Sequence, residues 1–212
     1  MKNLSWLSAL AIILFSCSVS KHHLPDGWVA LFDGKSLNGW KVGDNAETFS
    51  VDSGRIVVHG KTAHLFYDGP VMNHDFKNFE FKADVMTHHM TNSGIYIHTA
   101  FQQGGWPSKG YEVQVNNTHT DWIRTGSLYG FVNIKEVYVK DNEWFTMYIK
   151  VDGKRIIVKL NDRTVLDYTE PDNLERNKGD EFRRLSSGTF ALQGHDPNSL
   201  TYFKNIIVKP LP

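Results

Sequence analysis

Polar side chains alternate with apolar ones in two short runs, GIYIH at 94–98 and YEVQVN at 111–116. Successive side chains of a β-strand point to opposite faces, so each run predicts a strand with one polar face. The polar members are Tyr96, His98, Glu112, Gln114 and Asn116. A sheet face with a histidine, a carboxylate and amides is typical of a ligand site, because a solvated face more often carries Lys, Thr and Ser.

The loops around these two runs add aromatic and cationic side chains, namely Trp106, His119, Trp122, Arg124 and Tyr129. Aromatic rings beside amides, an acid and an arginine suit a sugar-sized ligand in a partly apolar cleft. We therefore expect the region 92–130 to contain a carbohydrate site.

Nearly all of the remaining chain has the pattern of short strands between turns. Strands are predicted at 28–32, 55–59, 79–86, 144–151, 155–160, 164–168, 189–193 and 202–208. The pair Asp152-Gly153 is a strong hairpin signal. No run has a convincing helical period, and 170–184 is expected to be a loop with at most one helical turn. This pattern predicts an all-β sandwich in preference to a barrel.

Composition restricts the class of protein further. Lys and Arg number 23, as do Asp and Glu, so the formal net charge is zero. A nucleic-acid-binding surface needs a basic excess, and we therefore expect no nucleic-acid partner. With 212 residues, the chain can bury a sizeable core in one domain without disulfide bonds.

The N-terminal segment resembles a bacterial lipoprotein signal. Lys2 is followed by an apolar run at 7–15 and by Cys17, the only cysteine, in the lipobox-like sequence LFSC. We expect a signal peptide at 1–17, a tether at 18–25 and the sandwich domain at 26–212. Cys17 would carry the lipid that anchors the chain to the outer membrane. Because the tether lacks an acidic run, a periplasm-facing anchor is favoured. A plain signal peptide with an incidental cysteine is the alternative.

Several phrases of the sequence match one family. They are GWVALFDG at 27–34, NSGIY at 92–96, GYEVQ at 110–114, GSLYG at 126–130 and GTFALQ at 188–193, followed by His195. The chain thus resembles the 3-keto-disaccharide (3-keto-glycoside) hydrolase family. The resemblance covers 26–212 and implies a concanavalin A-like jelly-roll β-sandwich.

The resemblance also implies an unusual way to break a glycosidic bond. A separate sugar 3-oxidoreductase first makes a ketone at carbon 3. The family member then removes the acidified proton at carbon 2 and expels the group at carbon 1. Water is added to the unsaturated product by the same member or by another. A divalent metal is implicated in some members.

This chemistry assigns roles to the candidate residues. His98, Glu112 and His195 are the expected ligands of a divalent metal, and His119 is a candidate base or fourth ligand. Arg124 could hold an oxyanion, so the expected catalytic set is His119, Glu112 and Arg124. The substrate is expected to contact Tyr96, Trp106, Lys109, Gln114, Tyr129 and Gln193.

Structural roles remain open for the same residues. Glu112 and Gln114 could form a solvated strand face, and His98 could be an ordinary polar-face histidine. Trp106 could simply anchor a loop, and Arg124 could pair with Asp121 or Glu112. The large aromatic residues expected in the core are Trp28, Phe32, Trp40 and Trp144.

Two other functions are weighed against 3-keto-glycoside cleavage. The first is a non-catalytic glycan-binding lipoprotein, since one fold can serve several functions. The second is a conventional glycosidase, which needs two carboxyl groups. Glu112 is followed at alternate positions by Gln114 and Asn116, so the strand lacks the second acid. Neither a serine-hydrolase elbow nor a dinucleotide-binding signature occurs.

Overall fold

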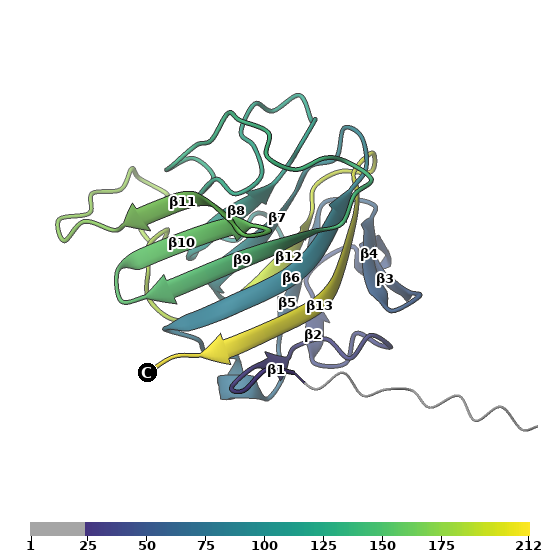
Figure 1. The fold of residues 1–212 in the computed structure, drawn as a ribbon, viewed down its shortest axis with the longest axis horizontal. Coiled ribbons are helices and arrows are strands. Elements are labelled where there is room, and N and C mark those ends of the chain that lie inside the picture. The colour runs from purple at the N-terminus through teal and green to yellow at the C-terminus, as the bar shows by residue number, and fades with distance from the viewer. Residues whose placement is uncertain (1–23) are drawn as a thin grey trace, which may run out of the picture.

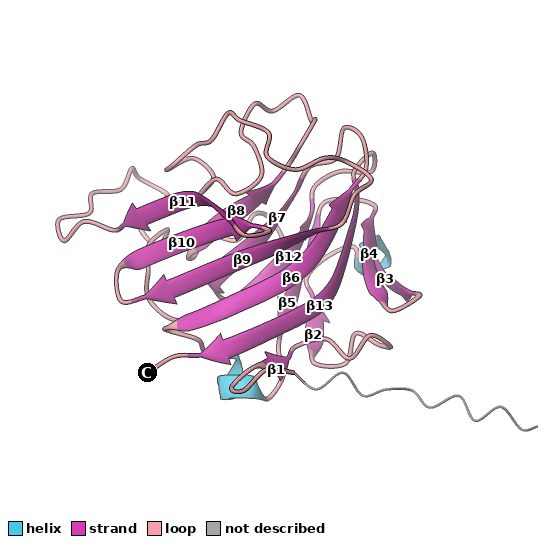
Figure 2. Ribbon diagram, viewed as in Figure 1, coloured by secondary structure: helices cyan, strands magenta, loops and turns pink. Residues whose placement is uncertain are grey.

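The computed structural model describes residues 24–212, which form two antiparallel β-sheets and two short 3-10 helices (Figures 1 and 2). The helices are η1 (Ala46–Thr48) and η2 (Val71–His74). The prediction of an all-β sandwich is confirmed. The predicted signal peptide at 1–17, Cys17 and most of the tether lie outside the described residues. Within 24–212, no helix is long and apolar enough to cross a membrane.

The larger sheet contains eight strands. In spatial order these are β11 (Arg163–Thr169), β10 (Arg155–Leu160), β9 (Phe145–Asp152), β6 (Phe79–Thr87), β13 (Leu200–Pro210), β4 (Arg55–His59) and β3 (Phe49–Asp52), with β1 (Val29–Ala30) paired to β13. The smaller sheet has the order β2 (Trp40–Val42), β5 (Ala63–Tyr67), β12 (Thr189–Gly194), β7 (Ser93–Thr99) and β8 (Tyr111–Val115). The hairpin predicted at Asp152-Gly153 joins β9 to β10.

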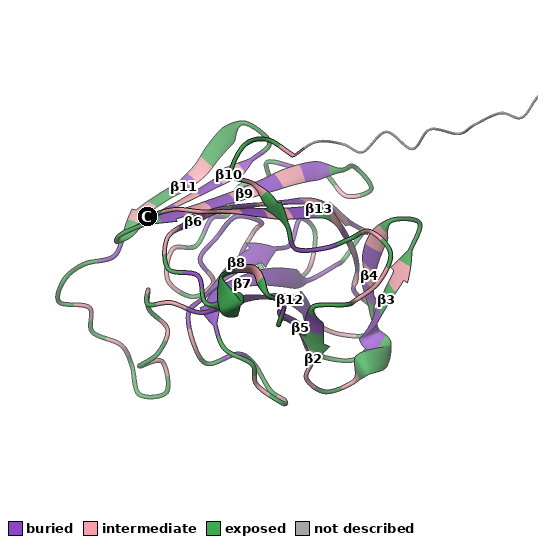
Figure 3. Ribbon diagram, turned by 90° about the horizontal axis from the view of Figure 1, so that it is seen from below, coloured by how far each residue is buried: buried purple, intermediate pink, exposed green. Residues whose placement is uncertain are grey.

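The core lies between the two sheets, which stack as separate layers in Figure 3. Strand β6 shows why the sequence folds this way. Phe79, Phe81, Ala83 and Val85 are fully buried, and the residues between them are half-exposed. Burying such apolar side chains is the main favourable contribution to folding. The alternation predicted for this strand is therefore confirmed.

The five-stranded sheet places its polar residues on the face that points away from the core. Ile95 and Val113 lie opposite each other and belong to the core between the sheets. Their neighbours Tyr96 and Glu112 also lie opposite each other and point outward. Gln193 of β12 lies opposite His64 of β5 on the same outer face. Four strands therefore bring polar side chains to one surface.

Three strands were not predicted from the sequence, and two core assignments were wrong. Strands β2 and β3 alternate but span only three and four residues, and β5 is buried at all five of its residues. Trp28, expected in the core, is half-exposed and is not part of it. Trp144, expected in the core, is 37% exposed. It lies just before β9, and the Lys204 ammonium lies 4.0 Å from the centre of its ring. Phe32 and Trp40 are buried as expected.

Candidate active site

A cavity of about 310 Å³ opens on the outer face of the five-stranded sheet. Strands β8 and β12 form its floor, and loops on several sides form its walls. Its lining residues are Asn92, Trp106, Glu112, Gln114, Tyr129, Arg183, Gln193 and His195. Five of the residues predicted from the sequence to bind substrate or to react therefore share one cavity with His195.

Glu112 is the buried acid of this cavity, with 6% of its surface exposed. The Tyr96 hydroxyl donates to its Oε2 at 2.8 Å, and Gln193 Nε2 donates to its Oε1 at 2.7 Å. Burial raises the pKa of Glu112, although these two hydrogen bonds act in the opposite direction. The carboxyl group is therefore more readily protonated than an exposed glutamate and can donate a proton to a bound ligand.

Gly94 provides the space in which the Glu112 side chain lies. A Cβ atom at position 94 would be only 2.5 Å from Glu112 Oε1 and 2.9 Å from its Cγ. Because Gly94 lies on β7 next to β8, the carboxyl group can extend over it towards Gln193. A glycine in a strand commonly marks such a close approach.

Two amide oxygens beside Glu112 have no partner among the described residues. Gln114 donates through Nε2 to Asn92 Oδ1 at 2.8 Å, and its Oε1 is buried without a hydrogen bond. The Oε1 of Gln193 is also buried without a hydrogen bond. A buried acceptor without a donor is costly, and a ligand hydroxyl that approached these amides could supply that donor.

His195 lines the cavity directly after the end of β12. Its Nδ1 is 2.8 Å from Asp196 Oδ2. Its ring centre is 5.4 Å from that of Trp106 and 5.6 Å from that of His119. The described residues form no hydrogen bond to Nε2, so this nitrogen remains available to a ligand.

Arg183 supplies the positive charge of the cavity, and it was not predicted from the sequence. Its Nη2 donates to the Tyr129 carbonyl at 3.3 Å, and its guanidinium lies 4.9 Å from the ring centre of Phe131. Its Nε is buried without a partner among the described residues. Arg183 comes from the loop 170–188, whose polar sequence gave no indication that it would reach the cavity.

Trp106 and Tyr129 form part of the rim. Trp106 is 50% exposed and stands between His195 and the buried His64, whose ring centre is 5.5 Å from its own. The Tyr129 hydroxyl donates to Asp121 Oδ2 at 3.0 Å. Burial, together with the nearby His195, lowers the pKa of His64 to about 4, so this residue is neutral at physiological pH. The sequence analysis gave His64 no role because β5 was not predicted.

His119 and Arg124 do not line the cavity. Arg124 Nη1 donates to Asn116 Oδ1, to the His119 carbonyl and to the Asp121 carbonyl at 3.1, 2.9 and 2.7 Å. Arg124 thus has a structural role in its own loop, through backbone carbonyls and Asn116 rather than through the expected pairing with the Asp121 or Glu112 carboxylate. His119 Nδ1 accepts a hydrogen bond from the Asp121 backbone at 3.1 Å. Its ring centre lies 5.6 Å from that of His195.

The expected position of His98 requires a correction. Its φ angle of +54° makes the end of β7 irregular, where the pairing with β12 also shifts, so the alternation that should have placed it beside Glu112 fails. The ring packs against Phe79, with centres 5.7 Å apart. Nε2 lies 2.9 Å from the Lys77 carbonyl, and the Ser186 backbone N–H donates to Nδ1 at 3.2 Å. Both ring nitrogens are therefore occupied away from the cavity.

Lys109 also lies elsewhere. It lines a second cavity of about 280 Å³ together with Phe66 and Phe101. Its Nζ donates to the Ser187 carbonyl at 2.6 Å. The structure does not bring Lys109 to the residues around Glu112.

The three expected metal ligands do not converge. His98 is turned away, each oxygen of Glu112 already accepts a hydrogen bond, and His195 Nδ1 contacts Asp196. Residues 24–212 contain no group of three or more His, Cys, Asp or Glu side chains suited to a metal ion. This donor set does not fit the divalent metal that the resemblance implies.

Two packed antiparallel sheets with a cavity on the outer face of the smaller sheet define a concanavalin A-like jelly roll. A carbohydrate binding module from Bacillus subtilis shares the fold at 13% identity, with a TM-score of 0.57 over 81% of this chain and 95% of that one. The family model described as the 3-keto-alpha-glucoside-1,2-lyase-like domain matches residues 27–209. The chain belongs to this family.

Two further relatives are similar over most of the chain. A 3-keto-disaccharide hydrolase from Bacteroides thetaiotaomicron is 26% identical over 170 residues, which are 68% of this chain and 59% of the relative. The chain thus spans less than two thirds of the length of that relative. A crystal structure of a candidate glycosyl hydrolase from Parabacteroides distasonis has a TM-score of 0.73 at 23% identity, covering 88% of this chain and 94% of the other.

Proposed function

We propose that this protein cleaves 3-keto-glycosides by elimination across carbons 1 and 2 of the oxidised sugar. The observation that carries the proposal is the meeting of three groups in one cavity: the buried Glu112 carboxyl, the His195 imidazole and the Arg183 guanidinium. Its family and the relative named a 3-keto-disaccharide hydrolase support the same chemistry.

His195 is the proposed base. A ketone at carbon 3 acidifies the hydrogen on carbon 2, so a base of near-neutral strength can remove it. Histidine is the common choice for this task at neutral pH. His195 Nε2 has no hydrogen bond from the described residues, whereas Nδ1 is bound to Asp196. His119 is less suited, because its Nδ1 already accepts the Asp121 backbone N–H and it does not line the cavity.

Glu112 and Arg183 are proposed to stabilise the charges that develop. As the proton leaves carbon 2, negative charge collects on the carbon 3 oxygen, where a guanidinium can stabilise it. The glycosidic oxygen at carbon 1 needs a proton as it departs. Glu112 can supply that proton because burial raises its pKa. The products are a 1,2-unsaturated 3-keto sugar and the free hydroxyl compound.

The proposed elimination requires a step before it and a step after it. Addition of water to the unsaturated product, in the same cavity or by another protein, would complete an overall hydrolysis. The substrate must come from an oxidoreductase that acts at carbon 3. We also propose lipid anchoring through Cys17 on the periplasmic side, which rests on the sequence around that residue.

Incubation with a 3-keto-glucoside and with its unoxidised parent tests the function directly. Each reaction is run with and without a chelator and followed by mass spectrometry. We expect release from the keto form alone, unaffected by the chelator, because the described donors do not fit a metal. Release from the parent would instead identify a conventional glycosidase. Binding without release from either compound would identify a glycan-binding protein, and loss of activity with the chelator would contradict the metal-free mechanism.

A further inference from the structure

A chain of hydrogen bonds runs behind the cavity wall from His195 to Gln114. His195 Nδ1 lies 2.8 Å from Asp196 Oδ2, and the Ser199 hydroxyl donates to the same oxygen at 2.8 Å. The Asn92 backbone N–H donates to Ser199 Oγ at 2.9 Å, and Gln114 Nε2 donates to Asn92 Oδ1 at 2.8 Å. These hydrogen bonds therefore connect two residues that line the cavity.

The bonds to Asp196 can form in only one direction. Partial burial raises the pKa of Asp196, but hydrogen bonds from His195, Ser199 and Asn198 outweigh this effect and hold the pKa below its usual range. An ionised carboxylate only accepts hydrogen bonds. His195 Nδ1 must therefore carry the proton that it shares with Asp196, and in the neutral ring the lone pair is then on Nε2.

The position of Asp196 is fixed by its own turn. The Asn198 backbone N–H donates to Asp196 Oδ1 at 2.8 Å, and the Ser199 backbone N–H donates to the Asp196 carbonyl at 3.1 Å. Ser199 and Asn92 are 4% and 3% exposed. The Asp196 carboxylate is thus held by Asn198 on one oxygen and by Ser199 on the other, so its contact with Nδ1 favours one orientation of the His195 ring.

We infer that Asp196 is the positioning residue of the site. It sets the tautomer of His195, so that Nε2 presents its lone pair to the substrate. Through Ser199 and Asn92 it also holds the Gln114 amide with Oε1 free for a sugar hydroxyl. The inference deepens the proposed function and rests on it for its kinetic consequences, although the tautomer of His195 can be measured without any reaction.

Substitution Asp196→Asn gives a specific expectation. Because Oδ1 accepts the Asn198 N–H, the new amide NH₂ would occupy the position of Oδ2 and face His195. It would then donate to Nδ1 and force the proton of the neutral ring onto Nε2. The corresponding change in a Ser-His-Asp triad produces the wrong tautomer and a large loss of kcat.

The chain contains a matched control for this substitution. Asp33 forms the same turn: the Lys35 backbone N–H donates to its Oδ1 at 2.7 Å and the Ser36 hydroxyl donates to its Oδ2 at 2.9 Å. The Asp33 carboxylate accepts hydrogen bonds from Lys35 and Ser36 and from no histidine of the described residues. The Asp33 turn lies near the N-terminal end of the domain. Asp33→Asn therefore changes the same local structure without affecting the proposed base.

Nitrogen NMR of the imidazole rings in ¹⁵N-labelled protein tests the inference. The His195 signals are assigned by their loss in His195→Gln. We expect the Nδ1–H tautomer in the natural protein and in Asp33→Asn, and the Nε2–H tautomer in Asp196→Asn. An Nε2–H tautomer in the natural protein would overturn the inference without use of a variant. An unchanged tautomer in folded Asp196→Asn would do the same.

Steady-state kinetics on the 3-keto-glucoside separates this inference from the proposed function. We expect Asp196→Asn to lower kcat by roughly 10²–10⁴-fold, with a much smaller change in KM, and Asp33→Asn to leave both unchanged. If the natural protein does not cleave the keto sugar, the proposed function fails while the tautomer measurement still stands. If it does and Asp196→Asn has normal kcat, the positioning role fails alone.

Discussion

Strands β6 and β9 of the eight-stranded sheet alternate buried and half-exposed residues, whereas β7 and β8 of the five-stranded sheet are buried at every residue. One side of each of these four strands faces the core. The other side is reached by solvent in the larger sheet, whereas loops cover it in the smaller sheet.

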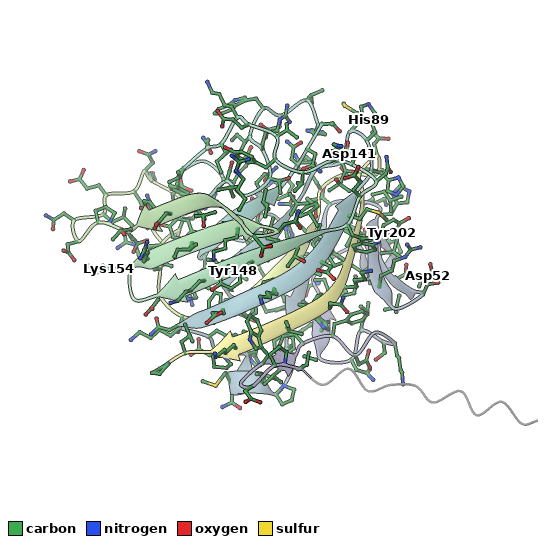
Figure 4. All side chains as sticks on the ribbon, in the orientation of Figure 1. Asp52, His89, Asp141, Tyr148, Lys154 and Tyr202 are labelled. Carbon is green, nitrogen blue, oxygen red and sulfur yellow. The ribbon has the colours of Figure 1, made fainter. Side chains whose placement is uncertain are left out.

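The outer face of the eight-stranded sheet is open to solvent and carries a hollow of about 630 Å³, whose lining includes Lys82, Tyr148 and Lys159. Tyr148 lies there among other side chains (Figure 4), with the ammonium groups of Lys82 and Lys159 at 5.8 and 5.3 Å from its ring centre. Asp84 pairs with Thr146 across the strands. Such contacts cost little to form and contribute little, because water can replace each of them.

The outer face of the five-stranded sheet is dry by comparison. Phe66, Tyr96 and Ala191 form a small buried cluster there, and the half-exposed Phe101 of the loop 100–110 packs on Phe66. Glu112 and Gln114 are buried beside this cluster. Burial of a carboxyl and an amide with an unpartnered oxygen opposes folding. These polar groups thus lower the stability of the smaller sheet, and under the proposed function they serve a ligand.

The strongest test of this comparison replaces one glutamate on each sheet. Glu112→Gln should lower kcat/KM on a 3-keto-glycoside by about 10²–10⁴-fold, the usual contribution of a proton donor. Glu80→Gln, on the half-exposed face of β6, should leave activity unchanged. Both variants should unfold at temperatures close to that of the natural protein. Equal activity in the two variants would mean that the two faces do not differ in function.

Gly94→Ala tests the fit of the Glu112 side chain with a smaller expected effect. The added Cβ would meet Glu112 Oε1 at 2.5 Å, so the carboxyl group must move. A displacement of about 1 Å can cost on the order of 10²-fold in rate. Activity should fall by that order, with little change in circular dichroism. Full activity with an unshifted Glu112, seen in a crystal structure of the variant, would contradict the assigned position.

The smallest expected effect concerns His64 and the stability of the folded protein at acidic pH. The pKa of His64 is about 4 in the folded chain against 6.5 for the ordinary group. As the pH falls below 6.5, the unfolded chain binds the proton first, so stability falls between 6.5 and 4. At pH 5 the loss is on the order of 2 kcal/mol.

His64→Phe keeps an aromatic ring against Tyr96 and Trp106 and removes the proton site. Denaturant unfolding at pH 7 and pH 5 should therefore show a smaller loss in this variant than in the natural protein. His89→Asn is the matched control, since the His89 side chain is 77% exposed. An identical loss in all three proteins would show that His64 is not neutral in the folded state.

Much of the fold could be predicted because the larger sheet follows its sequence pattern. The run 79–86 alternates, and β6 has that alternation in the structure. The alternation in 94–98 failed at His98, because a backbone with φ +54° turns the ring towards Phe79. Strand β5 was missed because all five of its residues are buried, on both faces.

The candidate site was predicted only where its residues follow the alternation of a strand. Glu112 and Gln114 lie on one strand, and the period of two places them together. Arg183 reaches the cavity, and His64 packs against Trp106 at its rim, only through tertiary packing, for which local sequence gives no signal. Asp196 could have been recognised, because it follows His195 directly and begins a turn to Ser199 like the one from Asp33.

The position of the last two strands in chain order has a consequence for how the domain is made. Strand β12 lies between β5 and β7, and β13 pairs with β1, β4 and β6. The middle of each sheet is thus built from the last two strands of the domain. Pairing between segments so distant in sequence is slow. Neither sheet, nor the cavity on the smaller one, can be complete until both of these strands have left the ribosome.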